Sequence, residues 1–263
     1  MPEGDLSTLR SKTRSVFRRA FHVLLDWLKI RRFREHSFFG SLLPQAATVA
    51  DFGAHRGEFF AALKSNYSIS QALLVEANPS LAESLRDAFP ETGVLHAALT
   101  AENGRDRVTF TRSAQPEASS IFREWAAAYG IRDQVEVPTV DLASVIQKLG
   151  GRIDLVKVDI EGAEIDVLRE ARADDLNSCG QFTVEFHDTR PAQTRCDVDE
   201  VCQRMRAEGY AIVNANWPKV DDVLFVNLKS MRMIQRIEFR CRVALANALF
   251  MMRRTFFGSN YSL

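Results

Sequence analysis

The hydrophobic positions along the chain predict alternating strands and helices from about residue 47 to residue 228. Short, almost continuously apolar stretches predict buried strands, whereas apolar residues spaced three and four apart predict helices. The expected strands are 48–52, 72–76, 93–99, 107–112, 135–140, 153–160, 182–187, 210–215 and 222–228. The expected helices are 57–64, 81–89, 119–130, 142–149, 163–171 and 197–207.

This alternation favours an α/β fold. We expect a Rossmann-like, doubly wound, mostly parallel sheet with helices on both faces. The last two strands follow one another closely and predict an antiparallel hairpin at one edge of the sheet.

Both ends of the chain show helical periodicity. The expected apolar face of the N-terminal segment comprises Phe17, Ala20, Phe21, Leu24 and Leu28. The expected apolar face of the C-terminal segment comprises Ile234, Ile237, Cys241, Leu245 and Leu249. We therefore divide the chain into an N-terminal basic amphipathic helical extension (1–36), a central domain (37–228) and a C-terminal basic amphipathic helix (229–263).

Charge separates the same three regions, although the formal net charge is zero. Residues 1–36 contain nine Lys and Arg against four Asp and Glu, and residues 229–263 contain seven against one. The body is therefore acidic, which excludes a uniformly basic nucleic-acid binder, and we expect no nucleic-acid partner. The basic ends have three interpretations: packing on the protein itself, homodimerisation, or docking on an anionic membrane surface.

No stretch approaches the roughly 18 uninterrupted apolar residues of a membrane span. The first 36 residues also lack the cleavage site of a signal peptide. We expect a cytoplasmic protein, with peripheral contact to the inner face of the membrane if the basic ends dock there.

The strongest candidate for chemistry is the segment ADFGAHRGE at 50–58, which joins the first expected strand to a helix. Gly53 lets the backbone approach a ligand without a Cβ in the way. Asp51 can accept hydrogen bonds from a cationic amino group, directly or through water. The spacing of Gly53 and Gly57 is not the G-x-G-x-x-G that holds a dinucleotide pyrophosphate. The looser turn suits a cofactor without phosphate, such as S-adenosylmethionine.

The second expected strand ends in Glu76. An acidic side chain at this position can bind both ribose hydroxyls of a nucleoside. Asp51 or Glu76 alone is readily explained as an ordinary strand-end carboxylate. Together, at the ends of consecutive strands, they favour a nucleoside-containing cofactor.

Several motifs, in order, resemble those of the FkbM family of methyltransferases. They are ADFGAHRGE (50–58), LVEANPS (74–80), AALT (97–100), the serine pair 119–120 and DLVKVDIEGAE (154–164). The resemblance covers roughly residues 47 to 228, and the last motif is the most distinctive. Ala77 stands where a proline is usual, and His55 and Arg56 replace a pair that is commonly small or polar.

The resemblance implies a Rossmann-like fold, bound S-adenosylmethionine and, typically, O-methylation of a sugar or polyketide hydroxyl. Applied to this sequence, it places the cofactor against the strand-end loops. The expected cofactor-binding residues are Asp51, Gly53, Ala54, Gly57, Glu76, Ala77, Asn78, Ser120 and Asp159.

Three further polar residues follow expected strands at the same edge of the sheet, where ligands of open α/β folds bind. We expect Asp159, Glu161 and His187 to be catalytic, and a histidine suits proton abstraction because its ordinary pKa is about 6.5. The structural alternatives are a helix cap, first-turn acids favoured by the helix dipole, and a hydrogen-bonded strand-end histidine. Such a set can also bind a divalent cation, but we predict no metal.

The sequence thus predicts an S-adenosylmethionine-dependent methyltransferase that methylates a hydroxyl of a sugar, glycan, glycolipid or related natural product. Two other functions stay open: an NAD-dependent oxidoreductase, which the absent glycine motif disfavours, and a non-catalytic binding protein on a degenerate methyltransferase fold. N-methylation also remains an alternative.

Overall fold

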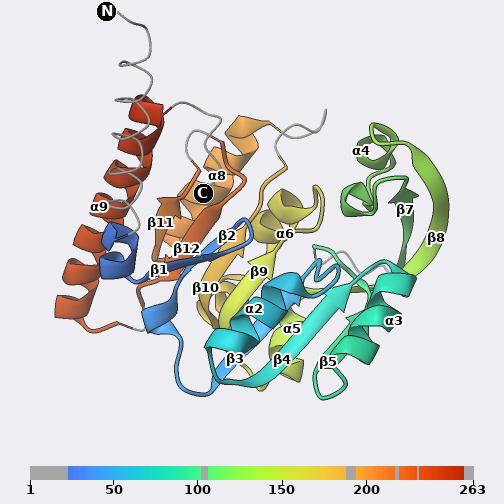
Figure 1. Cartoon of the computed structure of the whole chain (residues 1–263), viewed down its shortest axis with the longest axis horizontal. Coiled ribbons are helices and arrows are strands. Elements are labelled where there is room, and N and C mark those ends of the chain that lie inside the picture. The colour runs from blue at the N-terminus through green and yellow to red at the C-terminus, as the bar shows by residue number, and fades with distance from the viewer. Residues whose placement is uncertain (1–22, 102–105, 188–193, 217–218, 230, 258–263) are drawn as a thin grey trace, which may run out of the picture.

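The computed structural model describes residues 23–101, 106–187, 194–216, 219–229 and 231–257, with side chains up to residue 252. A seven-stranded sheet forms its centre, in the order β11-β12-β10-β9-β3-β4-β5 (Figure 1). Its strands are β3 (Ala47–Phe52), β4 (Ile69–Glu76), β5 (Gly93–His96), β9 (Ile153–Val158), β10 (Cys179–Val184), β11 (Tyr210–Asn214) and β12 (Val223–Asn227). β12 pairs antiparallel with both of its neighbours, β10 and β11, and the other strand pairs of this sheet are parallel. The expected doubly wound sheet with an antiparallel edge hairpin is confirmed.

Helices cover both faces of the sheet because neighbouring strand residues point to opposite sides. Ala50 of β3 packs in the core of one face and Val49 in the core of the other. The first face carries α5 (Leu142–Lys148), α6 (Glu164–Glu170), α7 (Ala173–Asn177) and α8 (Arg195–Ala207). The second carries α2 (Glu58–Asn66), α3 (Pro79–Ala88) and α9 (Met233–Phe257).

The N-terminal segment differs from the expectation. Residues 23–28 are helical, but β1 (Ile30–Phe33) and β2 (His36–Phe39) form an antiparallel hairpin that crosses the expected domain boundary at residue 36. The predicted helix is therefore wrong for residues 30–36. The hairpin forms because Ile30, Phe38 and Phe39 bury their side chains in the same core as α9. The predicted face residues Phe17, Ala20 and Phe21 lie outside the described residues.

A small lobe replaces part of the predicted pattern. The expected strand 93–99 divides into β5 and β6 (Ala98–Leu99), and β6 joins a second sheet, β6-β8-β7. Its other strands are β7 (Arg107–Ser113) and β8 (Ile131–Val140). The expected helix 119–130 is reduced to α4 (Arg123–Ala127), because Ser120 exchanges two backbone hydrogen bonds with Thr111 and is held extended. We call residues 107–140 the lobe.

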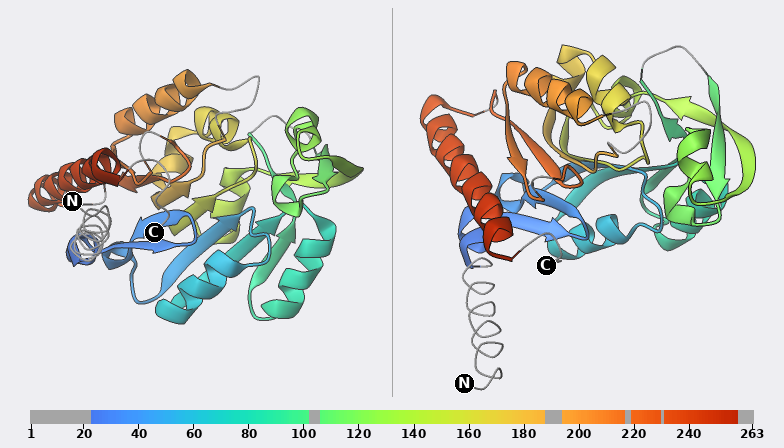
Figure 2. Two further views of the ribbon diagram at one scale, coloured as in Figure 1. Left: turned by 45° about the horizontal axis from the view of Figure 1, so that its top comes forward. Right: turned by 90° about the horizontal axis from the view of Figure 1, so that it is seen from above.

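The C-terminal helix is confirmed, but its orientation is not the expected one. Ile234, Ile237 and Leu245 of the predicted packing face are exposed, and only Leu249 of that set is buried with the core. The face that carries Phe239 and Val243 packs into the core instead, where the Phe239 ring lies edge-on to Phe39 of β2 with 4.7 Å between the ring centroids. Figure 2 shows α9 and the lobe at opposite ends of the molecule.

Candidate functional site

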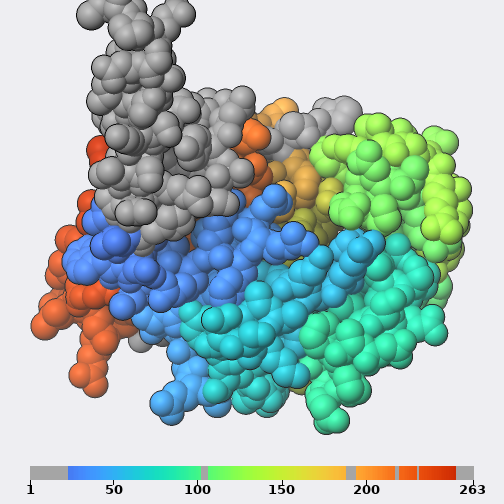
Figure 3. Space-filling model, viewed as in Figure 1, coloured from blue at the N-terminus to red at the C-terminus, as the bar shows by residue number. Residues whose placement is uncertain are grey.

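A cavity of about 1110 Å³ lies at the carboxyl ends of the parallel strands. It sits beside β3, the strand at which the chain direction across the sheet reverses, and this is where open α/β sheets bind ligands. The β1–β2 hairpin and the lobe both contribute to its lining. Figure 3 shows these two segments, blue and green, on either side of α2. Pockets for one small ligand measure about 300–1,000 Å³, so this cavity has room for a cofactor and an acceptor.

The structure separates the predicted site residues into two layers. Those that line the cavity are Gly53, Ala54, Glu76, Ala77, Asp159 and Glu161. Those that lie outside its lining are Asp51, Gly57, Asn78, Ser120 and His187. Ser119, rather than Ser120, faces the cavity. The outer residues therefore contribute through the residues that they contact.

Lys157 of β9 connects the ends of β3 and β9, and the sequence analysis did not identify it as a site residue. Its Nζ lies 3.3 Å from Asp51 Oδ1 and 3.3 Å from Asp159 Oδ2, and it donates a 2.7 Å hydrogen bond to the Gly53 carbonyl. Burial lowers the pKa of Lys157, but the carboxylates of Asp159 and Asp51 outweigh it and hold that pKa above its ordinary value. The ammonium is therefore a fixed positive charge at the cavity wall.

Asp51 is fully buried; its Oδ1 is paired with the Lys157 ammonium at 3.3 Å, and its Oδ2 has no hydrogen-bond partner among the described residues. Burial raises the pKa of Asp51, and the Lys157 ammonium opposes that rise. A buried carboxylate with free acceptor capacity is unusual, because such groups are normally satisfied. The arrangement fits a cofactor that brings its own cationic donor.

Gly53 is required by the packing of the strand ends. Its φ is +71°, and a Cβ would lie 1.7 Å from the carbonyl oxygen of Asp159. This close approach of two backbone segments is a different reason for glycine from the ligand approach that the sequence suggested. Gly57 also has a positive φ, forms the N-cap of α2, and leaves room for the Phe89 ring.

Glu76 is buried at the end of β4 and is oriented by backbone N–H groups. Its Oε2 accepts from His55 N at 2.8 Å and its Oε1 accepts from Asn78 N at 2.7 Å. Burial raises the pKa of Glu76 above its ordinary value, and these two hydrogen bonds oppose part of that rise. Each carboxylate oxygen keeps a second lone pair for a ligand hydroxyl. The Asn78 side chain, by contrast, caps α3 by accepting from Ser80 N and Oγ.

The turn after β9 is held by Glu164. This fully buried carboxylate accepts hydrogen bonds from the backbone N–H groups of Ile160 and Gly162, and its Oε1 lies 3.0 Å from His187 Nδ1. The backbone at Glu161 is left-handed, with a φ of 57°. Glu164 is therefore a structural residue that keeps this turn, and with it Asp159 and Glu161, in position.

His187 and the lobe hold the Glu161 side chain. Glu161 Oε2 accepts from Trp125 Nε1 at 2.9 Å and lies 3.3 Å from His187 Nε2, while Ser120 Oγ donates to the Glu161 carbonyl at 2.6 Å. Burial raises the pKa of Glu161 to about 7, with a smaller opposing effect from His187. Burial lowers the pKa of His187, but Glu164 and Glu161 together hold it well above its ordinary value. Both ring nitrogens are thus engaged by carboxylates.

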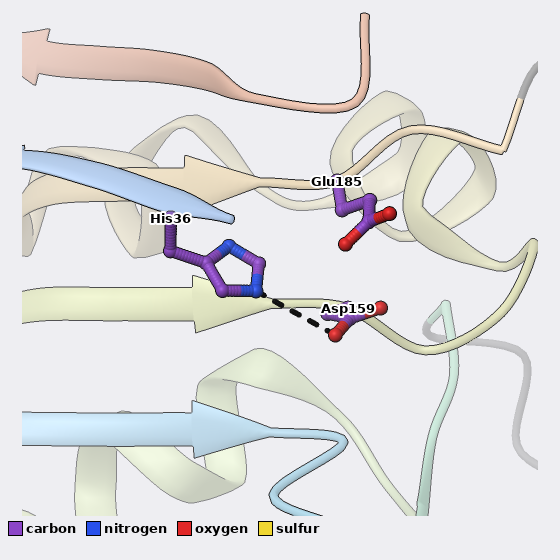
Figure 4. Close-up of side chains that lie close together, drawn as sticks. All are labelled: His36, Asp159 and Glu185. Carbon is purple, nitrogen blue, oxygen red and sulfur yellow. Dashed lines mark ion pairs between the residues drawn. The ribbon is translucent and has the colours of Figure 1, made fainter. Parts of the chain in front are cut away.

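His36 and Glu185 face Asp159 from two other segments (Figure 4). His36, on β2, is buried, and its Nε2 lies 3.5 Å from Asp159 Oδ2. Burial raises the pKa of Asp159, but Lys157 and His36 outweigh it and hold that pKa far below its ordinary value. Burial and the neighbouring Asp159 carboxylate raise the pKa of Glu185 to about 9. Asp159 is therefore the charged centre of this wall, and Glu185 takes up a proton readily.

Two sets of three side chains offer nitrogen and oxygen atoms close enough to bind a metal ion: His36 with Asp159 and Glu185, and Asp159 with Glu161 and His187. The Lys157 ammonium, 3.3 Å from Asp159 Oδ2, opposes a second cation on the shared carboxylate. The absence of a metal from the site stays a prediction.

Sequence signals for the missed residues differ in strength. Lys157 interrupts the apolar run IDLVKV, and a charged residue within a buried strand implies a buried partner. His36 has no such signal, because it lies outside the matching motifs and reaches the cavity only through the β1–β2 hairpin.

A family model described as "Methyltransferase FkbM domain" matches residues 51–212. No significant match was found among curated proteins.

Among solved structures, the chain is similar to the methyltransferase FkbM from Methylobacillus flagellatus KT, with 16% identity, 75% of this chain and 48% of that chain covered, and a TM-score of 0.47. The chain therefore spans about half the length of that protein. It is also similar to an amino pentose methyltransferase from Micromonospora echinaspora (11% identity, 86% and 98% covered, TM-score 0.40) and to an rRNA methylase from Streptococcus thermophilus (8%, 70% and 87%, 0.39). At these identities the acceptors of those enzymes carry no information about this chain.

Proposed function

Because the chain belongs to the family of FkbM methyltransferase domains, we propose that it transfers the methyl group of S-adenosylmethionine to a hydroxyl of a carbohydrate-like acceptor. The observation that carries this proposal is the pairing of two buried strand-end carboxylates beside one large cavity. Asp51 has unused acceptor capacity, and Glu76 is fixed by backbone N–H groups.

We assign the cofactor to the side of the cavity formed by the ends of β3 and β4, which we call the cofactor side. There Glu76 accepts hydrogen bonds from the ribose hydroxyls, and Gly53, Ala54 and Ala77 present backbone to the nucleoside. Asp51 lies beneath this wall, outside the cavity lining, and accepts from the amino group of the methyl donor through a bridging water. Gly57, Asn78 and Ser120 support the cofactor side and the turn opposite it through the contacts described above.

The opposite side of the cavity, bordered by His36, Glu161 and Glu185, is the acceptor side. When bound, S-adenosylmethionine supplies a methyl group already activated by its sulfonium. The residues of the chain therefore need only align the acceptor oxygen, exclude water and remove a proton, and positioning of this kind is worth about 7–11 kcal/mol. Glu161 receives the hydroxyl proton, since its pKa of about 7 suits a base at neutral pH.

The other predicted catalytic residues act differently in this proposal. His187, held between Glu161 and Glu164, is a positioning residue that orients the Glu161 carboxylate. Asp159 keeps its negative charge and fixes Lys157 and His36. In this proposal Glu161, and not His187, removes the proton from the acceptor hydroxyl.

The charges of the cavity support a neutral polyhydroxyl acceptor, a glycan or the glycan of a glycolipid. Carboxylates outnumber ammonium and guanidinium groups along the cavity lining. A polyanion such as nucleic acid would therefore be repelled. Hydroxyl groups, which both donate and accept, suit a wall of mixed polar groups.

Isothermal titration with S-adenosylhomocysteine tests the cofactor assignment. We expect micromolar binding by the wild type and loss of that binding in the Asp51→Ala, Glu76→Ala double variant. The matched control is the Glu83→Ala, Asp87→Ala double variant on the exposed face of α3, which should bind like the wild type. No binding by a folded wild type would overturn the proposal and leave NADH binding and partner binding as the next assays.

A further inference from the structure

The outward face of α9 is apolar along most of the helix. Ile234, Ile237, Leu245 and Met252 are 77%, 59%, 39% and 44% exposed. Their spacing places them on one side of an α-helix, with exposed Cys241 between them. We call these five residues the outer stripe. Single exposed apolar residues are ordinary, but a contiguous exposed patch marks an interaction site.

The opposite side of α9 is already in use. Phe239, Val243, Ala246 and Leu249 are buried in the core that also contains the β1–β2 hairpin. These residues anchor the helix in the core. The outer stripe is therefore a second apolar face, separate from the face that packs inside the protein. In Figure 1, α9 runs along the left edge of the molecule, where its outer side is not covered by the sheet.

Positive charge flanks the outer stripe. At 3.6 residues per turn, Arg240 lies on one side of the stripe and Arg242 on the other. The only acidic residue of 229–263 is Glu238, and its carboxylate is paired with Arg242. Glu238 neutralises Arg242, so Arg240 carries the positive charge beside the stripe that no acidic residue of 229–263 offsets.

We propose that the outer stripe of α9 lies in the plane of an anionic membrane surface. Its apolar side chains would enter the headgroup boundary while the flanking arginines contact lipid phosphates, as in other interfacial amphipathic helices. A second copy of the chain is a poorer occupant, because face-to-face pairing would bring two basic helices together. No helix among the described residues is long and apolar enough to cross a bilayer, so the contact is peripheral.

A second segment that packs in the same core as α9 also exposes large apolar side chains. Val23 and Trp27 are 65% and 61% exposed, on the short helix 23–28. The inward residues of that helix, Leu25 and Leu28, share a core with α9. Tryptophan is the side chain most typical of the membrane–water interface.

Cosedimentation with vesicles tests this proposal on the full chain at low salt. The vesicles contain phosphatidylcholine and phosphatidylglycerol in equal parts, with pure phosphatidylcholine as the neutral comparison. We expect binding to the anionic vesicles only. The Ile234→Ser, Ile237→Ser, Leu245→Ser triple variant should bind at least about a hundredfold more weakly, and Arg240→Gln about fivefold more weakly.

Matched controls lie at the other end of the molecule. Ile131→Ser changes a residue that is also 39% exposed, and Arg86→Gln removes an exposed arginine of α3. Both should bind like the wild type. The proposal is overturned if the folded wild type does not bind anionic vesicles. It is also overturned if the triple variant binds anionic vesicles as well as the wild type does. A third overturning result is a wild-type dimer in sedimentation that is lost in the triple variant, together with no vesicle binding.

Discussion

The cofactor side and the acceptor side of the cavity are built in different ways. On the cofactor side, Asp51, Gly53 and Glu76 come from two consecutive strands, and Glu76 is fixed by backbone N–H groups of neighbouring loops. On the acceptor side, His36, Glu161 and Glu185 come from a hairpin before the family match and from the ends of two later strands. A short segment of sequence therefore specifies the first side, whereas the second exists only after the chain has folded.

The largest expected effect comes from Lys157, the residue that contacts both sides. Lys157→Met removes the ammonium and leaves the fully buried Asp51 carboxylate without its ion-pair partner. Breaking a buried ion pair in this way costs about 3–5 kcal/mol of unfolding free energy. Urea unfolding checks the value, with Lys148→Met, an exposed lysine at the end of α5, as the control. An equally stable Lys157→Met protein would contradict the role of Lys157 as the link.

The next largest effect is expected on the affinity for S-adenosylhomocysteine, which should depend on the cofactor side and not on the acceptor side. Glu76→Gln places an amide NH₂ against one of two backbone donors and removes a charge, so S-adenosylhomocysteine should bind about 10- to 100-fold more weakly. Glu185→Gln is the matched change on the acceptor side and should leave that affinity unchanged. Titration calorimetry measures both variants. Equal losses would mean that the cofactor extends across the whole cavity.

A smaller effect is expected in the dependence of stability on pH. Burial and the Asp159 carboxylate raise the pKa of Glu185 to about 9 in the folded protein, so the folded state keeps a proton that the unfolded chain releases above about pH 4.3. Stability therefore falls as pH rises through this window. Between about pH 6 and pH 8, Glu185→Gln should remove about 2–3 kcal/mol of this decline. Denaturant unfolding at both pH values checks it, and Glu91→Gln, which alters an exposed carboxylate outside the cavity lining, should behave like the wild type.

The smallest effect is expected from chelation. The proposal needs no metal, and Lys157 opposes a divalent cation at Asp159. S-adenosylhomocysteine affinity and thermal stability should therefore be the same with and without EDTA. Tight binding of Mn²⁺, detected by electron paramagnetic resonance and lost in Asp159→Asn, would contradict this expectation.

The comparison also explains what the sequence was able to predict. Apolar periodicity and the strand-end carboxylates predicted the sheet, its edge hairpin and the region of the cavity, since these depend on local pattern and on the register of parallel strands. Periodicity failed for α9, because that helix has two apolar faces and only tertiary packing selects Phe239 and Val243 over Ile234 and Ile237. It also failed for the β1–β2 hairpin, because four charged residues obscure an alternation that only burial against the sheet makes evident.

The site residues, too, were predictable where they depend on local pattern and unpredictable where they depend on tertiary packing. The sequence identified Gly53, Ala54, Glu76 and Ala77, which line the cavity. It did not distinguish Ser119, which faces the cavity, from Ser120, which holds the turn behind it. His36 was beyond prediction, because its approach to Asp159 depends on long-range packing of the hairpin.

The loop between β3 and α2 has a consequence for engineering the protein. Its backbone is left-handed at Gly53, His55 and Gly57, and only His55 among these carries a side chain, with a φ of 50°. A left-handed residue other than glycine is strained by about 1–2 kcal/mol, and the buried Nε2 of His55 has no hydrogen-bond partner among the described residues. Selection for heat resistance alone would therefore favour glycine at this position, where the N–H that Glu76 accepts would remain. The imidazole ring that His55 contributes to the cavity wall would be lost, so a gain in stability at this residue would also change the wall that a ligand meets.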